Sequence, residues 1–176
     1  MTVLFFITRL ITLPGAYLRA FLEHIVCKAR KLIVETKTYI RLDEACGHVE
    51  HEFPKSRASA LLISLLPGTI TFIFGVIFTV SGLLPLTLLK IRPGDSVPMF
   101  AVYVVLLWLG ASFLCNIFPL YEDALNSREL LNDGGKAAKI IFTVPCAVSS
   151  VGAFLEKNCI TVLTTAAIIV CAFIFL

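Results

Sequence analysis

Charged side chains are the scarcest feature of this 176-residue chain. Asp, Glu, Lys and Arg make up 15% of it, hydrophobic residues make up 58%, and the mean hydropathy is +0.92. Soluble domains carry about 25% charged residues, so this composition argues against a soluble domain and against a disordered tail. The net charge of +3 is too small to indicate a nucleic-acid partner. The composition therefore predicts an integral membrane protein.

The usual catalytic motifs are missing from the sequence as well. It has no glycine-rich phosphate loop, no serine in a nucleophile elbow and no Cys-x-x-Cys pair. Its six cysteines have no regular spacing, which argues against a disulfide-stabilised secreted module. The most apolar stretches also lack histidine and all charged residues, so they offer no carriers for an ion relay through a bilayer.

Charge is absent altogether from four long stretches. A bilayer core of roughly 30 Å is crossed by about 20 apolar residues in a helix. We therefore predict an all-α integral membrane protein in which an N-terminal region, 1–57, precedes a four-helix transmembrane domain, 58–176. A tight hairpin around Asn158 joins the last two spans. The predicted spans cover approximately residues 62–89, 97–121, 139–156 and 158–176.

The distribution of Lys and Arg predicts the orientation of these spans. Twelve of the 15 basic residues precede the first span or follow the second, and only Lys90, Arg92 and Lys157 fall on the opposite side. Basic residues concentrate on the cytosolic side of membrane proteins. This pattern predicts a multi-pass protein with both termini in the cytosol.

The first 35 residues predict an amphipathic helix rather than a span, because Arg9, Arg19 and Glu23 interrupt their apolar run. From Pro14 onward, the apolar residues fall on one arc of a helix and the charged residues on the other. Either the apolar stripe lies in the acyl boundary with its basic face among headgroups, or the stripe packs on the spans. Both interpretations keep this helix at the membrane surface.

All three histidines precede the first predicted span, and two of them lie in the polar segment 43–54. Asp43 can cap a short helix there, and Pro54 can end it. Such a helix places His48 and His51 three residues apart on one face, where both can bind a single metal ion. A solvated amphipathic helix is the alternative. The remaining candidate ligands are His24, Glu44 and Asp123, and zinc is the ion that best suits imidazole and carboxylate ligands.

The candidate ligand Asp123 belongs to a second motif, in which Asn116-x-x-Pro119 is followed by an acidic pair. Together with the histidine segment, this motif resembles the plan of site-2-type intramembrane zinc proteases. The resemblance covers about a dozen residues and implies that Asp123 is a metal ligand and Asn116 a structural polar group. It also implies a glutamate base, for which helical geometry favours Glu52 over Glu50. The sequence departs from that family in having its histidines three residues apart, within a charged segment.

Three functional hypotheses follow. The first is a polytopic membrane protein with a zinc-binding His and carboxylate cluster at the cytosolic membrane face. The second is a minimal membrane-bound zinc hydrolase that uses Glu52 as its base. The third is a non-catalytic scaffold or accessory subunit of a membrane complex. The expected partners are the lipid bilayer and either other membrane proteins or further copies of the chain.

Overall fold

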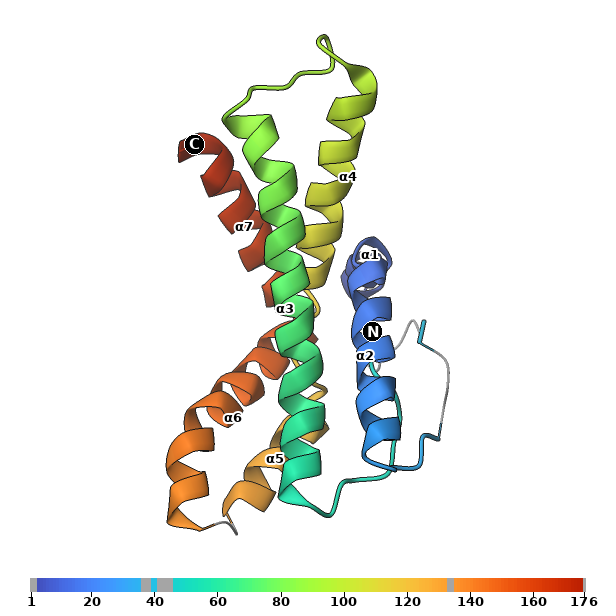
Figure 1. Ribbon diagram of the computed structural model, residues 1–176, viewed down its shortest axis with the longest axis vertical. Helices are drawn as coiled ribbons and strands as arrows, with labels where there is room; N and C mark the ends of the chain where they lie inside the picture. Colours follow the sequence, from blue (N-terminus) through green and yellow to red (C-terminus); the bar gives the residue numbers. More distant parts are fainter. Residues whose placement is uncertain (1–2, 36–38, 41–45, 133–134, 176) are drawn as a thin grey trace.

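All regular secondary structure is helical in the computed structural model, which describes residues 3–35, 39–40, 46–132 and 135–175. The all-α prediction is therefore confirmed for these residues. Helix α3 runs along the whole long axis (Figure 1), with α4 and α7 beside one half and α2, α5 and α6 beside the other. The helices, in chain order, are α1 (Val3–Ile11), α2 (Leu13–Ala29), α3 (Arg57–Thr87), α4 (Val97–Leu114), α5 (Tyr121–Asn132), α6 (Lys136–Lys157) and α7 (Ile160–Phe175).

Three helices in the described residues are long and apolar enough to cross a membrane. They are α3, α4 and the Lys139–Lys157 part of α6. The 16 residues of α7 are also apolar, but they extend only about 24 Å at 1.5 Å per residue. The structure thus supports three of the four predicted spans by length and composition, and the fourth corresponds to a shorter helix.

The second predicted span ends earlier than its apolar run. Helix α4 stops at Leu114, residues 115–120 leave the helix, and the polar helix α5 occupies a region predicted to be a loop. Pro119 has no N–H to continue a helical ladder. The backbone groups of Ile117 and Phe118 bond instead to buried side chains, which stabilise the interruption.

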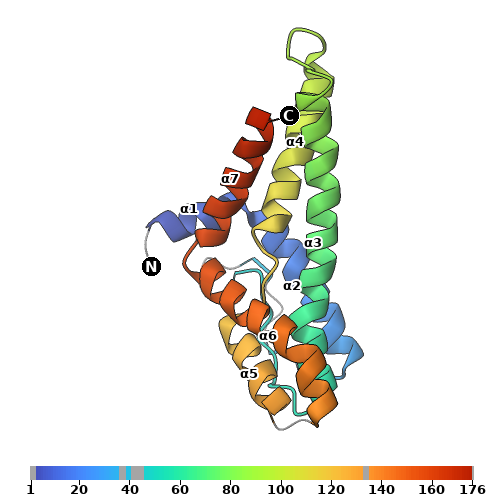
Figure 2. The ribbon, with the colours of Figure 1, turned by 90° about the vertical axis from the view of Figure 1, so that its left-hand side faces the viewer.

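The predicted hairpin after the third span is not formed. Helices α6 and α7 follow one another along the long axis (Figure 2), with a bend at Asn158 and Cys159, whose φ is 59°. Glu156 accounts for this path because its buried contacts fix the end of α6 at mid-height. The C-terminus consequently lies at the same end of the molecule as the 88–96 loop. The prediction that both termini share one side of the membrane had assumed a hairpin that turns the chain back at this point.

The predicted short polar helix is also corrected. Residues 43–45, including Glu44, lie outside the described residues, and the chain from Cys46 to Pro54 is not helical. Gly47 makes a turn at a φ of 86°, and His51 then forms an antiparallel bridge with Val34. Bonds to α2 hold this segment extended, as shown below, and they outweigh its local preference for a helix.

Helix α2 faces the interior with its polar side. Arg19 and Glu23 are each 1% exposed, whereas Tyr17, Phe21 and Ile25 are 43–48% exposed. The centre of the predicted apolar stripe therefore points away from the other helices, although Val26 on its flank packs against Ile63 of α3. The polar arc was expected to meet headgroups, but its middle is buried and only Lys28, Arg30 and Lys31 at its end are exposed.

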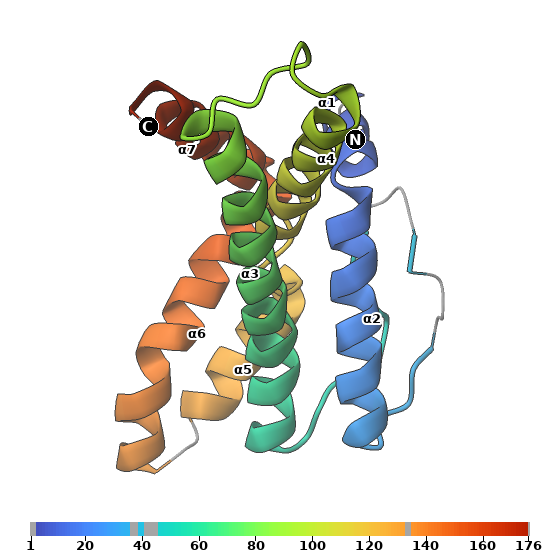
Figure 3. The same cartoon turned by 45° about the horizontal axis from the view of Figure 1, so that its top comes forward.

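Helix α6 shows the same reversed polarity. An outward row of apolar side chains follows its length, whereas its inner face consists mostly of small residues and ends at Glu156. The outward row is Ile140, Ile141, Val144, Val148, Val151 and Phe154. Figure 3 shows α6 and α2 on opposite sides of α3. Apolar side chains therefore face outward on both sides of the half of the molecule that contains α2, α5 and α6, which we call the polar half.

Helices α3 and α4 approach closely through small residues. A Cβ added to Gly110 would overlap the Thr79 backbone of α3, and one added to Gly82 would overlap backbone atoms of α4. Next to these contacts, the Phe78 and Phe113 rings meet edge to face with centroids 5.5 Å apart. Such close approach is typical of helix pairs in lipid, where van der Waals packing drives association.

Gly110→Ala is therefore expected to destabilise the helix pair by roughly 1–3 kcal/mol, the usual cost of overpacking. Thermal unfolding of the detergent-solubilised protein measures the effect. Gly94→Ala is the matched control because no atom lies within 4 Å of its added Cβ, and it should leave the unfolding temperature unchanged. Equal unfolding temperatures for the two variants would contradict this packing.

Candidate metal centre

Three side chains from separate parts of the chain meet around the imidazole of His51. Its Nε2 lies 3.8 Å from Oε1 of Glu23 on α2 and 3.7 Å from Oδ2 of Asp123 on α5. One ligand atom from each residue lies within 4.8 Å of the other two. We call Glu23, His51 and Asp123 the triad.

The hydrogen bonding of His51 determines which of its ring nitrogens faces the two carboxylates with a lone pair. Nδ1 donates a hydrogen bond to the Glu52 carbonyl (3.0 Å), so Nε2 carries the lone pair when the imidazole is neutral. Nε2 is buried and has no hydrogen-bond partner among the described residues. A lone pair facing two carboxylates is repulsive, so this position requires either a proton or a cation.

The environment of His51 favours the proton when no metal is bound. Burial alone would lower the pKa of His51, but the Asp123 carboxylate, the Glu52 carbonyl and the Glu23 charge outweigh it and raise the pKa to about 9. The metal-free triad is therefore an imidazolium between two carboxylates at neutral pH. A metal ion would replace this proton.

The spacing of the triad suits a small divalent ion. Ligand atoms about 2.0–2.2 Å from a tetrahedral zinc ion lie about 3.4 Å from one another. The separations of 3.7 and 3.8 Å from His51 Nε2 exceed this by a few tenths of an ångström, and the two carboxylate oxygens lie within 4.8 Å of each other. Three protein ligands also leave the fourth tetrahedral position open, as in catalytic zinc sites.

Glu23 is held in place by the segment before α3. His48 Nδ1 donates to Oε2 of Glu23 (3.1 Å), and the Val49 amide donates to Oε1 (3.3 Å). Hydrogen bonds of this kind orient ligating carboxylates in metal sites. His48 therefore contacts a triad member without being one, and this bond holds its segment against α2.

A second buried network surrounds the interruption after α4. Nη1 of Arg9 donates to Asn116 Oδ1 (2.8 Å) and to Glu156 Oε1 (3.2 Å). The other Glu156 oxygen accepts the Phe118 amide (3.1 Å), and Nδ2 of Asn116 donates to the carbonyls of Thr12 and Ser112. Asn116 thus links α2 and α4, and this network fixes the ends of α4 and α6.

Arg19 lies between the triad and this network and is only partly satisfied. Nη1 donates to the Ile117 carbonyl, but Nε and Nη2 are buried without a partner among the described residues. Burial lowers the pKa of Arg19, although the charges of Glu23, Glu156 and Asp123 oppose the shift. Buried donors without partners are rare and often mark functional positions.

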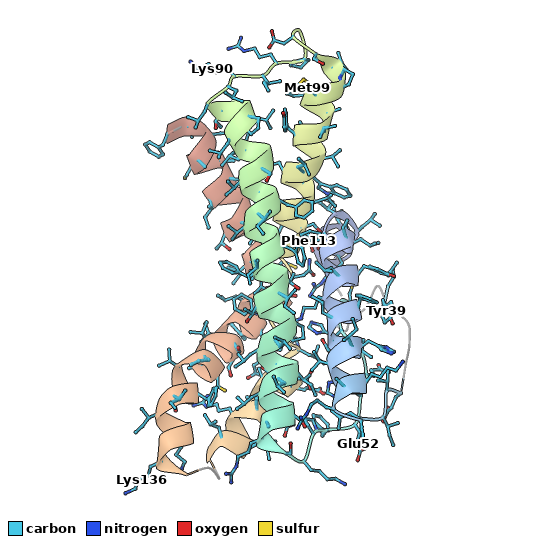
Figure 4. All side chains as sticks on the ribbon, in the orientation of Figure 1. Tyr39, Glu52, Lys90, Met99, Phe113 and Lys136 are labelled. Atoms are coloured by element: carbon cyan, nitrogen blue, oxygen red, sulfur yellow. The ribbon has the colours of Figure 1, made fainter. Side chains whose placement is uncertain are left out.

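The other predicted site residues lie away from the triad. The His24 ring meets Tyr39 edge to face with a centroid separation of 5.8 Å. Glu52 is exposed and pairs with Lys55 at 3.6 Å (Figure 4 shows Glu52 near the outer end of the polar half).

Cys27 is near the triad, but burial and the charges of Glu23 and Asp123 raise the pKa of its thiol to about 12. It therefore remains a thiol at neutral pH.

Sequence reasoning brought His51 and Asp123 together as candidates but missed Glu23. Glu23 was assigned to a face among headgroups, where a charge on an amphipathic helix is ordinary. Its signal was the neighbouring Arg19, since two ionisable residues one turn apart in an apolar stretch usually face protein or water. Arg9 was counted only as an interruption of the apolar run, and Glu156 was placed at the predicted hairpin, so both were missed as well.

A cleft of about 290 Å³ lies next to the triad. His48 and Glu50 line one side of it, and Arg9 and Glu156 line another. Because His48 also contacts Glu23, a molecule in the cleft is separated from the triad by one side chain. The cleft is therefore a partly polar space that shares His48 with the surroundings of the triad.

No protein family, curated protein or solved structure matches this chain.

The pKa of His51 predicts how the stability of the metal-free protein changes with pH. Because the folded-state pKa of about 9 exceeds the ordinary value of 6.5, the stabilisation is fully present below about pH 6.5. It is lost as the pH rises through about 9, by roughly 3 kcal/mol in all. Unfolding in the presence of a chelator at pH 6 and pH 9 measures this loss.

His51→Gln should reduce the difference in unfolding free energy between pH 6 and pH 9, because glutamine does not titrate. His24→Gln is the matched control and should retain the full difference, since His24 lies outside the triad. A pH dependence that is identical in the wild type and in His51→Gln would contradict an imidazolium between two carboxylates.

Proposed function

We propose that this protein is an integral membrane protein that binds one divalent transition metal ion in its polar interior, through Glu23, His51 and Asp123. The observation that carries the proposal is the buried Nε2 of His51, which faces two carboxylates and has no hydrogen-bond partner among the described residues. A metal ion satisfies all three ligands at once. The proton that replaces it offers only charge attraction, because 3.7 and 3.8 Å are too long for hydrogen bonds.

Zinc is the proposed ion. One imidazole nitrogen and two carboxylate oxygens form a donor set that zinc accepts readily, and magnesium and calcium prefer oxygen ligands alone. The hydrogen bonds from His48 and Val49 to Glu23 supply the outer support that such sites usually have.

We also propose that the outer surface of the protein faces the lipid bilayer. Helices α3, α4 and α6 have the length and composition of spans, and α7 is proposed as a short fourth span. Lys136 and Glu52 lie at one end of the molecule and Lys90 at the other (Figure 4). We assign the first end, which also carries Lys28, Lys31 and Lys55, to the cytosol, because basic residues concentrate there. This assignment places the C-terminus on the opposite side, unlike the sequence prediction.

A zinc hydrolase remains the second candidate, because a cleft adjoins a site with an open coordination position. Glu52 does not support it as the base, since its side chain is exposed and paired with Lys55. His48, Glu50 and Glu122 line the cleft and are the candidates for acid or base chemistry in a hydrolytic activity.

Metal analysis of the purified protein tests the proposal. After equilibration with zinc and removal of free ion, the wild type should retain one zinc per chain, measured by plasma mass spectrometry. Asp123→Asn and His51→Ala should each reduce zinc affinity at least tenfold through loss of a ligand. Glu52→Gln and His24→Ala are the controls, and both should retain zinc.

Circular dichroism of each variant shows whether it remains folded. A folded wild type that retains no zinc would eliminate the metal site and favour the non-catalytic scaffold. Zinc retained at full affinity by the Asp123→Asn, His51→Ala double variant would place the metal elsewhere.

A further inference from the structure

A small, mostly apolar cavity with a few hydroxyl groups in its walls lies outside the triad, between α3, α6 and the interruption after α4. Its volume is about 190 Å³, and Ser64 and Gly68 of α3, Ile117 and Ser149 of α6 are among its lining residues. Ser64 is 2% exposed, and its hydroxyl has no hydrogen-bond partner among the described residues. The cavity therefore contains a buried donor that nothing in the described structure satisfies.

Arg19 reaches the wall of this cavity from α2. Its Nη1 donates to the Ile117 carbonyl and lies 2.8 Å from the position that a Cβ on Gly68 would occupy. Both Gly68 and Ile117 line the cavity. The missing side chain at Gly68 is what allows the guanidinium to come this close. Nε and Nη2 are unpartnered among the described residues, so a buried positive charge with unused donors lies directly behind the wall that Gly68 and Ile117 form.

The nearby carboxylates do not use these donors. Glu23 is bonded to His48 and the Val49 amide, and Glu156 is bonded to Arg9 and the Phe118 amide. Asp123 faces His51. Each acid that influences Arg19 thus has a partner of its own, so the guanidinium remains available to an anionic ligand.

An apolar groove continues from this cavity along α3. The groove has a volume of about 340 Å³ and shares Phe72, Ile117 and Phe118 with the smaller cavity. At its far end it is lined by Val76 of α3 and Ile168 of α7. Residues 64, 68, 72 and 76 follow at intervals of four on one face of α3, over about 18 Å. The combined space is therefore elongated, with the Arg19 guanidinium behind the wall at one end and apolar side chains along the other.

We propose that this space binds a single-chain carboxylate amphiphile, such as a fatty acid. Its carboxylate lies against Arg19 and Ser64, and its hydrocarbon chain extends along α3 toward Ile168. A carboxylate matches the guanidinium fork and accepts from a hydroxyl at the same time. The head space of about 190 Å³ continues into one groove, which favours one chain over a two-chain phospholipid. This site is separate from the triad and does not depend on a bound metal.

Equilibrium binding of radiolabelled palmitate to the purified protein in a nonionic detergent tests the proposal. Binding should be saturable at one palmitate per chain, and unlabelled palmitate should compete while hexadecanol should not. Arg19→Gln should weaken binding by about tenfold to a hundredfold, as expected for loss of a charged hydrogen-bond donor. Competition by hexadecanol equal to that by palmitate would overturn the proposal, because the anionic end would then contribute nothing.

Variants at the apolar end keep the test valid if Arg19→Gln does not fold. Val76→Trp fills the groove at a residue that is already exposed and should abolish palmitate binding while leaving the binding of octanoate, whose chain ends sooner. Val80→Trp is the matched control, since Val80 is similarly exposed on α3 and does not line the groove. An equal effect of both variants, or the absence of saturable binding, would overturn the proposal.

Two further arms define the ligand. Lysophosphatidic acid should compete more weakly than palmitate because its head is larger than a carboxylate, and stronger competition would overturn the assignment of a carboxylate. Palmitate binding should persist in His51→Ala with a chelator present. Loss of zinc without loss of palmitate separates this site from the proposed metal centre.

Discussion

Ionised side chains that leave water must find partners, and this requirement organises the centre of the molecule. Arg9, Arg19, Glu23, Asp123 and Glu156 are all 9% exposed or less. Removing one partner of a buried ion pair typically costs about 3–5 kcal/mol, so these groups constrain the backbone strongly. The end of α4, the bend between α6 and α7, and the extended segment before α3 each occur where a buried charge bonds to the chain.

The same requirement explains the reversed polarity of α2 and α6. Their charged or small faces point toward other helices, and their bulky apolar faces point outward. In water this arrangement would expose hydrocarbon and bury charge, and both are unfavourable. In lipid the outward face is compatible with its solvent, and the charges are best placed in the protein interior. The proposed metal centre and the proposed amphiphile site both depend on this polar interior.

The sequence allowed the most apolar elements to be predicted because their signal is local. Charge-free runs indicated α3, α4 and α6. Elements that depend on contacts distant in sequence could not be predicted in this way. His48 and His51 favour a helix locally, but Glu23, more than 20 residues earlier, holds their segment extended. The path of α6 into α7 likewise depends on Arg9, nearly 150 residues away. At the candidate site, pattern and resemblance identified His51 and Asp123, whereas Glu23 required knowledge of which face of α2 is buried.

The most direct test of this account asks which solvent the outward apolar faces meet. A single tryptophan is placed at Val151 on α6, in a Trp108→Phe background, and the protein is reconstituted into vesicles. Its fluorescence should be quenched by brominated lipid and not by acrylamide, and tryptophan at the exposed Lys55 should show the opposite behaviour. Quenching at position 151 by acrylamide and not by brominated lipid would contradict a polar interior enclosed by lipid-facing helices.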